Sequence, residues 1–185
     1  GHDFPNVTLV GVLAADMSLY TDDYRSGERT FQLLTQAAGR AGRGERPGDV
    51  VIQTYDPGHY AIEAAAAQDY EMFYEQEIAY REMMGYPPAE NLTAVHVSCE
   101  DEELLEKGCH YLKEYILRIK GNVPVQVIGP ASPGIDKIRD VYRRVIYLKS
   151  PRYDTLVKIK DMMEKYIEIN SGFDKMRIQF DFNPM

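Results

Sequence analysis

The chain has 185 residues, of which 44% are hydrophobic and 27% are charged, and its formal net charge is −8. This composition is typical of a globular protein, and the length suits one large domain or one small domain with part of another. It excludes a membrane span, because no apolar run approaches ~20 residues, and the acidic charge excludes a protein that coats nucleic acid over its whole surface. The N-terminus does not resemble a signal peptide. Two cysteines, Cys99 and Cys109, form neither a metal cluster nor a disulfide framework, so we expect a cytoplasmic protein.

Residues 1–57 predict a strand, a helix and a second strand. Residues 7–13 form a continuous apolar run, of the kind that is covered on both faces of a parallel sheet. A helix is expected to begin near Glu28 and to end near residue 40, and residues 49–55 (DVVIQTY) predict the second strand. The buried face of the helix should carry Phe31, Leu34 and Ala38. Because nothing upstream of the first strand is present, we expect the chain to be a fragment.

Two arginines, Arg40 and Arg43, lie three residues apart at the C-terminal end of this helix, among glycines and alanines. Arginine keeps its charge, and its fork of donors matches phosphate oxygens, while glycine lets a ligand approach the backbone. A nucleoside triphosphate would suit this pair, which could stabilise charge that develops on a transferring phosphate. The alternative is a tightly packed helix end with two solvated arginines.

The string Gln-x-x-Gly-Arg-x-Gly-Arg at residues 36–43 resembles the last motif of superfamily 2 helicases. Residues 1–5 (GHDFP) resemble the end of another motif of that superfamily. The segment 23–34 between them, and the segment 69–88, are similar to the primosomal replication-restart helicases, the PriA (primosomal protein N′) family. The family pattern has an aspartate where this chain has Ala14.

This resemblance implies that residues 1–57 are the C-terminal part of helicase lobe 2, a RecA-like lobe, in a helicase that unwinds DNA 3′ to 5′ and restarts replication at stalled forks. ATP and Mg²⁺ would bind the intact parent, and zinc would bind the family's upstream region. Residues implied to bind nucleotide are Gln36, Gly39 and Asp3, and those implied to be catalytic are Arg40 and Arg43. The sequence contains no Gly-x-x-x-x-Gly-Lys-Ser/Thr loop, so the chain alone should be inactive.

Residues 58–88 predict a helical linker. The stretch 59–67 is rich in alanine, and residues 69–84 (DYEMFYEQEIAYREMM) predict an acidic, aromatic helix with Asp69 as its N-cap. Gly85 and the prolines after it should end this helix. In the resembling family, this segment joins the helicase lobe to the C-terminal domain.

Residues 89–185 predict a separate α+β domain. Strands are expected at 92–99, 123–129, 140–149 and 176–182, with helices at 102–120 and after Ser150-Pro151. The buried stripes should be Leu105, Cys109, Leu112, Ile116 and Ile119 on the first helix, and Leu156, Ile159, Met163 and Tyr166 on the second. The order β-α-β-β-α-β is ferredoxin-like. The predicted fold class is therefore α/β plus α+β.

Basic residues gather in the predicted hairpin 136–152, which we call the basic hairpin. They could neutralise phosphates of single-stranded or forked DNA while a tyrosine stacks on a base. The residues predicted to contact DNA are Lys137, Arg139, Arg143, Tyr147 and Lys149. Because alternate residues of a strand face opposite ways, Arg144 should lie on the other face from Arg143. The alternative is a solvated hairpin whose tyrosines pack in the core.

Two other interpretations remain for the whole chain: a DNA- or protein-docking module without its own catalysis, and a structural domain without a ligand. The four histidines are scattered and have no metal-ligand spacing. By the resemblance, the partners would be forked or single-stranded DNA, single-strand DNA-binding protein and other primosome proteins, and no membrane.

Overall fold

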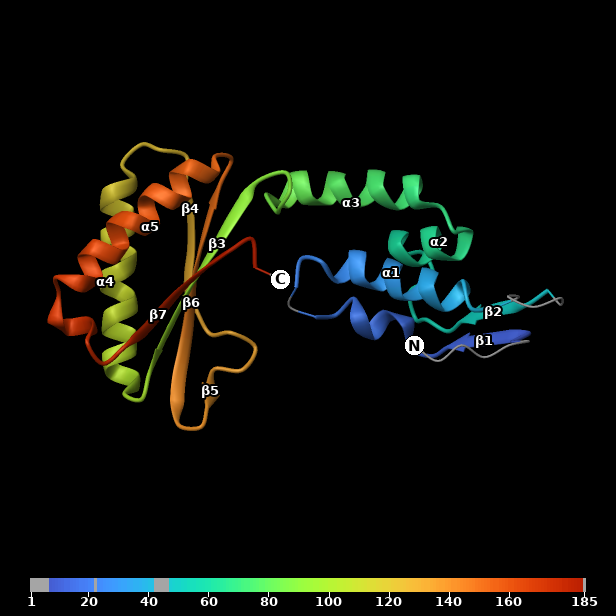
Figure 1. Cartoon of the computed structure of the whole chain (residues 1–185), viewed down its shortest axis with the longest axis horizontal. Helices are drawn as coiled ribbons and strands as arrows, with labels where there is room; N and C mark the ends of the chain where they lie inside the picture. The colour runs from blue at the N-terminus through green and yellow to red at the C-terminus, as the bar shows by residue number, and fades with distance from the viewer. Residues whose placement is uncertain (1–6, 22, 42–46, 185) are drawn as a thin grey trace. The chain divides into compact units, whose positions relative to one another are not determined.

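The computed structural model describes residues 7–21, 23–41 and 47–184. The chain divides into two compact units, residues 1–80 and 81–185, which we call unit 1 and unit 2 (Figure 1). None of the described helices is long and apolar enough to cross a membrane.

Unit 1 contains a two-stranded sheet, in which β1 (Leu9–Val12) pairs in parallel with β2 (Asp49–Ile52). The helix α1 (Ser26–Ala38) connects them, after a short 3-10 turn at Ala15–Ser18. Parallel strands separated by a helix agree with the sequence prediction. Within the described part of unit 1 the sheet is not covered on both faces, because residues in β1 and β2 alternate between exposed and half-buried.

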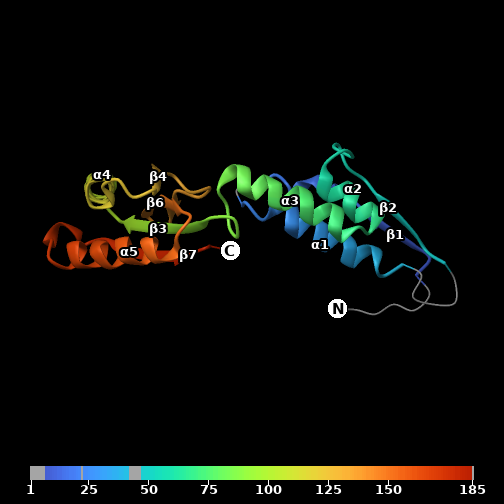
Figure 2. The same ribbon diagram turned by 90° about the horizontal axis from the view of Figure 1, so that it is seen from above.

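The core of unit 1 forms where α2 (Tyr60–Ala67) and α3 (Tyr70–Met84) lie beside α1 (Figures 1 and 2). The Phe31 and Phe73 rings stack with centroids 4.3 Å apart. The Tyr60 hydroxyl donates to Glu77 Oε2 at 2.6 Å, and a Cβ at Gly27 would lie 2.6 Å from that hydroxyl. The start of α1 therefore needs a glycine where it meets this pair.

Most of the predicted linker 58–88 packs within unit 1. The small, buried alanines of α2 let it approach α1 closely, and Phe73 of α3 covers Phe31, so α2 and most of α3 belong to unit 1. The predicted N-cap is confirmed, because Asp69 Oδ1 accepts from the Met72 N–H at 2.9 Å.

Unit 2 is an antiparallel sheet covered on one face by two helices (Figure 1). Its strand order is β4-β6-β3-β7, and the short β5 pairs with β6. The strands are β3 (Asn91–Cys99), β4 (Gln126–Ala131), β5 (Lys137–Ile138), β6 (Val141–Ser150) and β7 (Arg177–Phe182). The helices are α4 (Glu102–Lys120) and α5 (Tyr153–Glu168).

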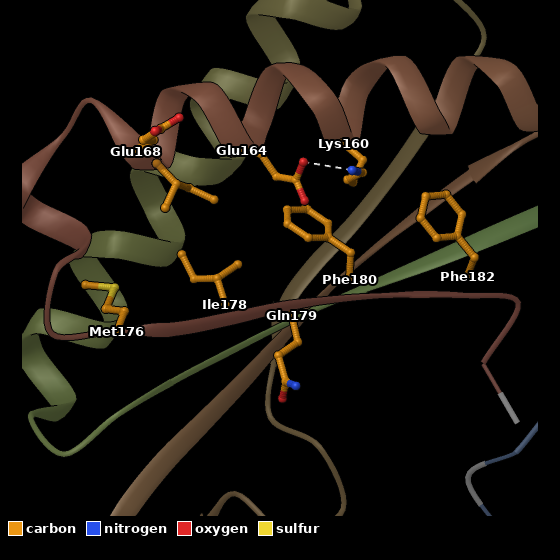
Figure 3. Close-up of a pocket in the computed structure, with 9 residues that line it drawn as sticks. Lys160, Glu164, Glu168, Met176, Ile178, Gln179, Phe180 and Phe182 are labelled. Atoms are coloured by element: carbon orange, nitrogen blue, oxygen red, sulfur yellow. Dashed lines mark hydrogen bonds and ion pairs between the residues drawn. The ribbon is translucent and has the colours of Figure 1, made fainter.

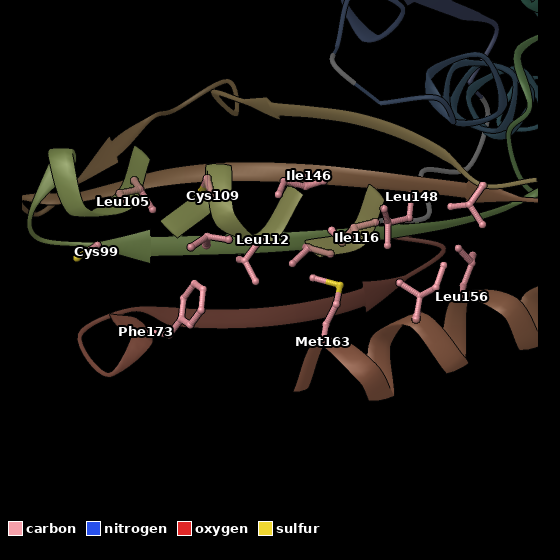
Figure 4. Packing of buried hydrophobic residues seen from close by; sticks show 14 residues of the cluster. Cys99, Leu105, Cys109, Leu112, Ile116, Ile146, Leu148, Leu156, Met163 and Phe173 are labelled. Atoms are coloured by element: carbon pink, nitrogen blue, oxygen red, sulfur yellow. The ribbon is translucent and has the colours of Figure 1, made fainter. Parts of the chain in front are cut away.

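The core of unit 2 lies between the sheet and these helices (Figure 4). The predicted stripe of α4 is confirmed, with Leu105, Cys109, Leu112 and Ile116 fully buried and Ile119 partly buried. That of α5 is confirmed as well, with Leu156, Ile159 and Met163 buried and Tyr166 partly buried. Each fully buried aliphatic side chain contributes about 1.5–3 kcal/mol to folding.

Two features of unit 2 differ from the sequence prediction. The strand β4 begins at Gln126 rather than at residue 123, and its register with β6 shifts between Ile128 and Ala131. Gly129 makes this shift possible, because its φ is +100° and a Cβ there would lie 2.7 Å from the Val145 carbonyl oxygen. The strand β5 was not predicted, because two residues are too few for a periodic pattern.

Candidate nucleotide and nucleic-acid sites

The C-terminal turn of α1 carries three of the predicted nucleotide-site residues. All three are exposed: Gln36 lies in the last turn of α1, Gly39 is its C-cap and Arg40 lies in the turn that follows. The Gly39 N–H donates to the Thr35 carbonyl at 2.9 Å, which keeps this turn helical up to the glycine. The opposite side is anchored in the core by Leu34 and its neighbours. Arg40 therefore lies exposed at the surface, two residues after the end of a packed helix.

The other two predicted residues of this site, Arg43 and Asp3, lie outside the described residues. Among the residues that the structure does describe, no three His, Cys, Asp or Glu side chains are grouped so that they could hold a metal ion. An exposed arginine directly after a helix that ends in glycine suits contact with a phosphate.

Two residues of the basic hairpin, Lys137 and Arg139, are exposed, as contact with DNA would require. The Lys137 ammonium donates to the Tyr142 hydroxyl at 3.3 Å and lies 3.2 Å from Asp140 Oδ1. The hydrogen bond to Tyr142, and next the one to Asp140, raise the pKa of Lys137. Part of its charge is therefore already countered within the hairpin.

Lys149 corrects the prediction for the basic hairpin. Its side chain is buried, and its ammonium donates to the Met84 carbonyl at 2.8 Å and lies 3.7 Å from the centre of the Tyr86 ring. Burial lowers the pKa of Lys149. The segment that leaves α3 covers this lysine, so we remove it from the set of residues proposed to contact DNA.

Arg144 faces α4, and it lies on the other face of β6 from Arg143, as the alternation predicted. Its guanidinium donates to Glu106 at 2.6 Å and to Glu102 at 3.4 Å, and its side chain is 13% exposed. Arg143 lies on the opposite face and is half-buried, as is Tyr147. Of the five predicted DNA contacts, Arg143 and Tyr147 therefore share a face, while Lys137 and Arg139 belong to the turn region.

The sheet face opposite the helices holds a small polar cavity of about 160 Å³. Its lining residues include His96, Ser98, Pro133, Arg143 and Gln179. Burial lowers the pKa of His96; the nearby Asp181 opposes this effect, and Arg143 adds to it.

A larger groove of about 630 Å³ lies between α5 and β7, with both apolar and charged side chains in its lining (Figure 3). Ile178 and Phe180 point from β7 toward α5, whereas Gln179 points away (Figure 3). Glu168 and the Lys160–Glu164 pair, whose atoms are 2.7 Å apart, line the same groove on the α5 side. The apolar side chains on the β7 side of this groove suit contact with apolar groups of a partner.

Residues 82–185 match the family model of the primosomal protein N C-terminal domain. The chain belongs to this family. It is 43% identical to the replication restart protein PriA of Bacillus subtilis, over 100% of this chain and 23% of that protein. Its identity to the PriA of Synechocystis is 37% and to that of Haemophilus influenzae 32%, over 96% and 100% of this chain. The chain thus spans about a quarter of its relatives' length, and it matches their C-terminal portion.

In this PriA-family chain, sequence reasoning did not bring together His96 and Gln179, which line the small polar cavity, or Arg177, which pairs with Ser98 beside them. His96 was judged a scattered histidine, and the other two lie in a strand that was expected only to bury its alternate residues. The alternation of β3 does place His96 and Ser98 away from the core. Only the strand register shows that Arg143, Arg177 and Gln179 lie beside them.

Proposed function

We propose that the chain is the C-terminal part of an ATP-dependent 3′–5′ DNA helicase that restarts replication at stalled forks. The observation that carries this proposal is the match along the whole chain to the C-terminal portion of replication restart proteins, at 43% identity to the Bacillus subtilis relative. The protein would act in the cytoplasm. It would use ATP and Mg²⁺, with zinc held elsewhere in the full-length protein.

Unit 1 is proposed to be the end of RecA-like helicase lobe 2. Support comes from the parallel β1-α1-β2 arrangement and from apolar residues of the sheet that unit 1 leaves exposed. Leu9 is 62% exposed and Val51 is 58% exposed. Neighbouring strands and helices of a complete lobe would cover such positions on both faces of the sheet.

Unit 2 is proposed to be a ferredoxin-like domain that binds DNA and partner proteins. Support comes from its element order β-α-β-β-α-β and from its antiparallel sheet, with the strands in the order β4-β6-β3-β7. Forked or single-stranded DNA would be its nucleic-acid ligand.

In this mechanism, Arg40 and Arg43 would donate to phosphate oxygens of ATP as negative charge develops during transfer. Gln36 and Gly39 would hold the nucleotide beside them, and Asp3 would contribute from the other motif. Bound Mg²⁺ would neutralise charge on the β- and γ-phosphates. Since the phosphate loop is absent from this sequence, the isolated chain should not hydrolyse ATP.

The test is ATP hydrolysis by the full-length protein with Arg40→Ala or Arg43→Ala. Each change should lower turnover by ~10³–10⁵, the contribution of comparable arginines in phosphoryl transfer, while DNA binding is kept. Gln32→Ala, on an exposed position of the same helix, is the matched control and should leave turnover unchanged. If both arginine variants lose less than about threefold in turnover, the loss is far below the factor expected for such arginines. Arg40 and Arg43 would then have a structural role.

A second candidate function is protein docking, favoured by the groove between α5 and β7. The proposed occupant is an extended segment of a primosome protein or of single-strand DNA-binding protein, with apolar side chains facing Ile178 and Phe180. Methyl NMR distinguishes the two ligands. Partner docking should shift the signals of Met176 and Ile178, whereas DNA on the opposite sheet face should leave them unchanged.

A further inference from the structure

Three neighbouring strands bring polar residues together on the sheet face of unit 2 that lies opposite α4 and α5. Ser98 of β3 pairs with Arg143 of β6 on one side and with Arg177 of β7 on the other. In the adjacent row, His96 pairs with Gln179 of β7. Cross-strand partners share a face, so these side chains lie together. With strands about 4.8 Å apart, the two arginine backbones are roughly 10 Å apart.

The connection between β4 and β5 turns this face into a pocket. Pro133 lines the cavity of about 160 Å³ together with His96, Arg143 and Gln179. The Arg143 N–H donates to the Asp136 carbonyl at 2.8 Å, which ties this connection to β6. The cavity has room for a group several times larger than a water molecule, whose share of volume is about 30 Å³.

The pocket is rich in hydrogen-bond donors and has one unneutralised positive charge. Within the described part of the chain, Arg143 makes no ion pair, in contrast to Arg144 on the other face, which binds two glutamates. Gln179 and His96 can each donate from a side-chain nitrogen. Asp181 is the acidic neighbour of His96, and it lies on the side of the pocket away from Ser98 and the two arginines. An anion would therefore be attracted to the arginine side.

We propose that this pocket holds one backbone phosphate of single-stranded DNA, bound by Arg143, His96 and Gln179, with Arg177 meeting a neighbouring phosphate. The inference rests on the proposed DNA-binding function and gives it a location. It moves the contact from the exposed turn of the basic hairpin to the sheet face. Three residues of this site, His96, Arg177 and Gln179, lie outside both the basic hairpin and the helicase motifs.

The test measures the salt dependence of oligothymidylate binding to the whole chain, residues 1–185. On single strands the logarithmic slope is about −0.7 per neutralised phosphate. Arg143→Gln should therefore flatten the slope by about 0.7, and Arg143→Gln with Arg177→Gln by about 1.4. Arg118→Gln, on an exposed position of α4, is the control and should leave the slope unchanged.

A second arm uses an abasic oligomer of the same length and follows the His96 ring protons by NMR. A phosphate pocket should bind the abasic oligomer and shift these signals, and Gln179→Ala should weaken both ligands equally. Binding of oligothymidylate but not of the abasic oligomer would overturn the proposal in favour of a base pocket. An unchanged salt slope in folded Arg143→Gln, or no DNA binding at low salt, would also overturn it. ATP hydrolysis by the full-length protein is measured separately, so the helicase proposal can stand or fall on its own.

Discussion

In unit 2, two amphipathic helices close over one face of the sheet, and residues such as Leu112 and Ile146 are fully buried. In unit 1, three helices pack against one another, but Leu9 and Val51 of its two-stranded sheet remain largely exposed. The same kinds of apolar strand thus have different surroundings in the two units. Unit 2 buries its own core, whereas unit 1 offers apolar sheet surface that suits further packing.

The largest expected effect comes from opening the closed core of unit 2. Leu112→Ala should lower the free energy of unfolding of unit 2 by about 2–5 kcal/mol, because it removes buried methyl groups and leaves a cavity. The rate of thiol labelling measures this loss of stability, because Cys99 and Cys109 are buried in unit 2 and react when it unfolds. The sequence has no other cysteine. Burial raises the pKa of Cys109 to about 12, so the folded thiol should react slowly at neutral pH.

The control for this experiment is Leu117→Ala on the same helix, where the side chain is 39% exposed. It should speed thiol labelling far less than Leu112→Ala. Equal effects of the two variants would show that α4 does not bury the face seen in the structure.

A smaller effect is expected at Lys149. Lys149→Ala should destabilise unit 2 by about 1–3 kcal/mol, because the Met84 carbonyl loses its donor and the lysine stem loses its packing. Thiol labelling measures this loss as well. Lys137→Ala, at an exposed position of the basic hairpin, is the comparison and should leave labelling unchanged.

The same Lys149 variant separates structure from DNA contact. Lys149→Ala should leave the salt slope of DNA binding unchanged as long as unit 2 is folded. A slope flattened by about 0.7 would instead return Lys149 to the set of phosphate contacts.

The smallest effect in the isolated chain is expected at the exposed sheet of unit 1. Val51→Ala should change the stability of unit 1 by no more than about 0.5 kcal/mol, as surface substitutions do. In the full-length protein the same change should cost more, because the proposed lobe would cover this position. Hydrogen exchange of α1 in both proteins measures the difference, and an equal effect in both would remove the support for a completed lobe.

The sequence predicted those parts of the molecule whose structure follows from local periodicity. The stripe from Leu105 to Ile116 identifies the buried face of α4, and the alternation of β6 separates Arg143 from Arg144. Both patterns depend only on the geometry of one element, so one sequence is enough to find them.

The sequence failed where distant segments meet. Lys149 has the pattern of an exposed strand residue, and only the fold brings the Met84 carbonyl and the Tyr86 ring over it. The alanine-rich segment of α2 predicted only a linker, because alanines do not form a helix face that is clearly more apolar than the other. In the structure these alanines are buried against α1. The row of Arg143, Ser98 and Arg177 depends on the register of three strands, which no local pattern specifies.

The most direct test of this comparison is amide hydrogen exchange of β1 and β2 in the isolated chain and in the full-length protein. We expect fast exchange of these strands in the isolated chain and strong protection in the full-length protein, while the amides of β3 and β6 in unit 2 are protected equally in both. Equal protection of β1 and β2 in the two proteins would contradict the account that unit 1 is part of a larger helicase lobe whereas unit 2 buries its own core.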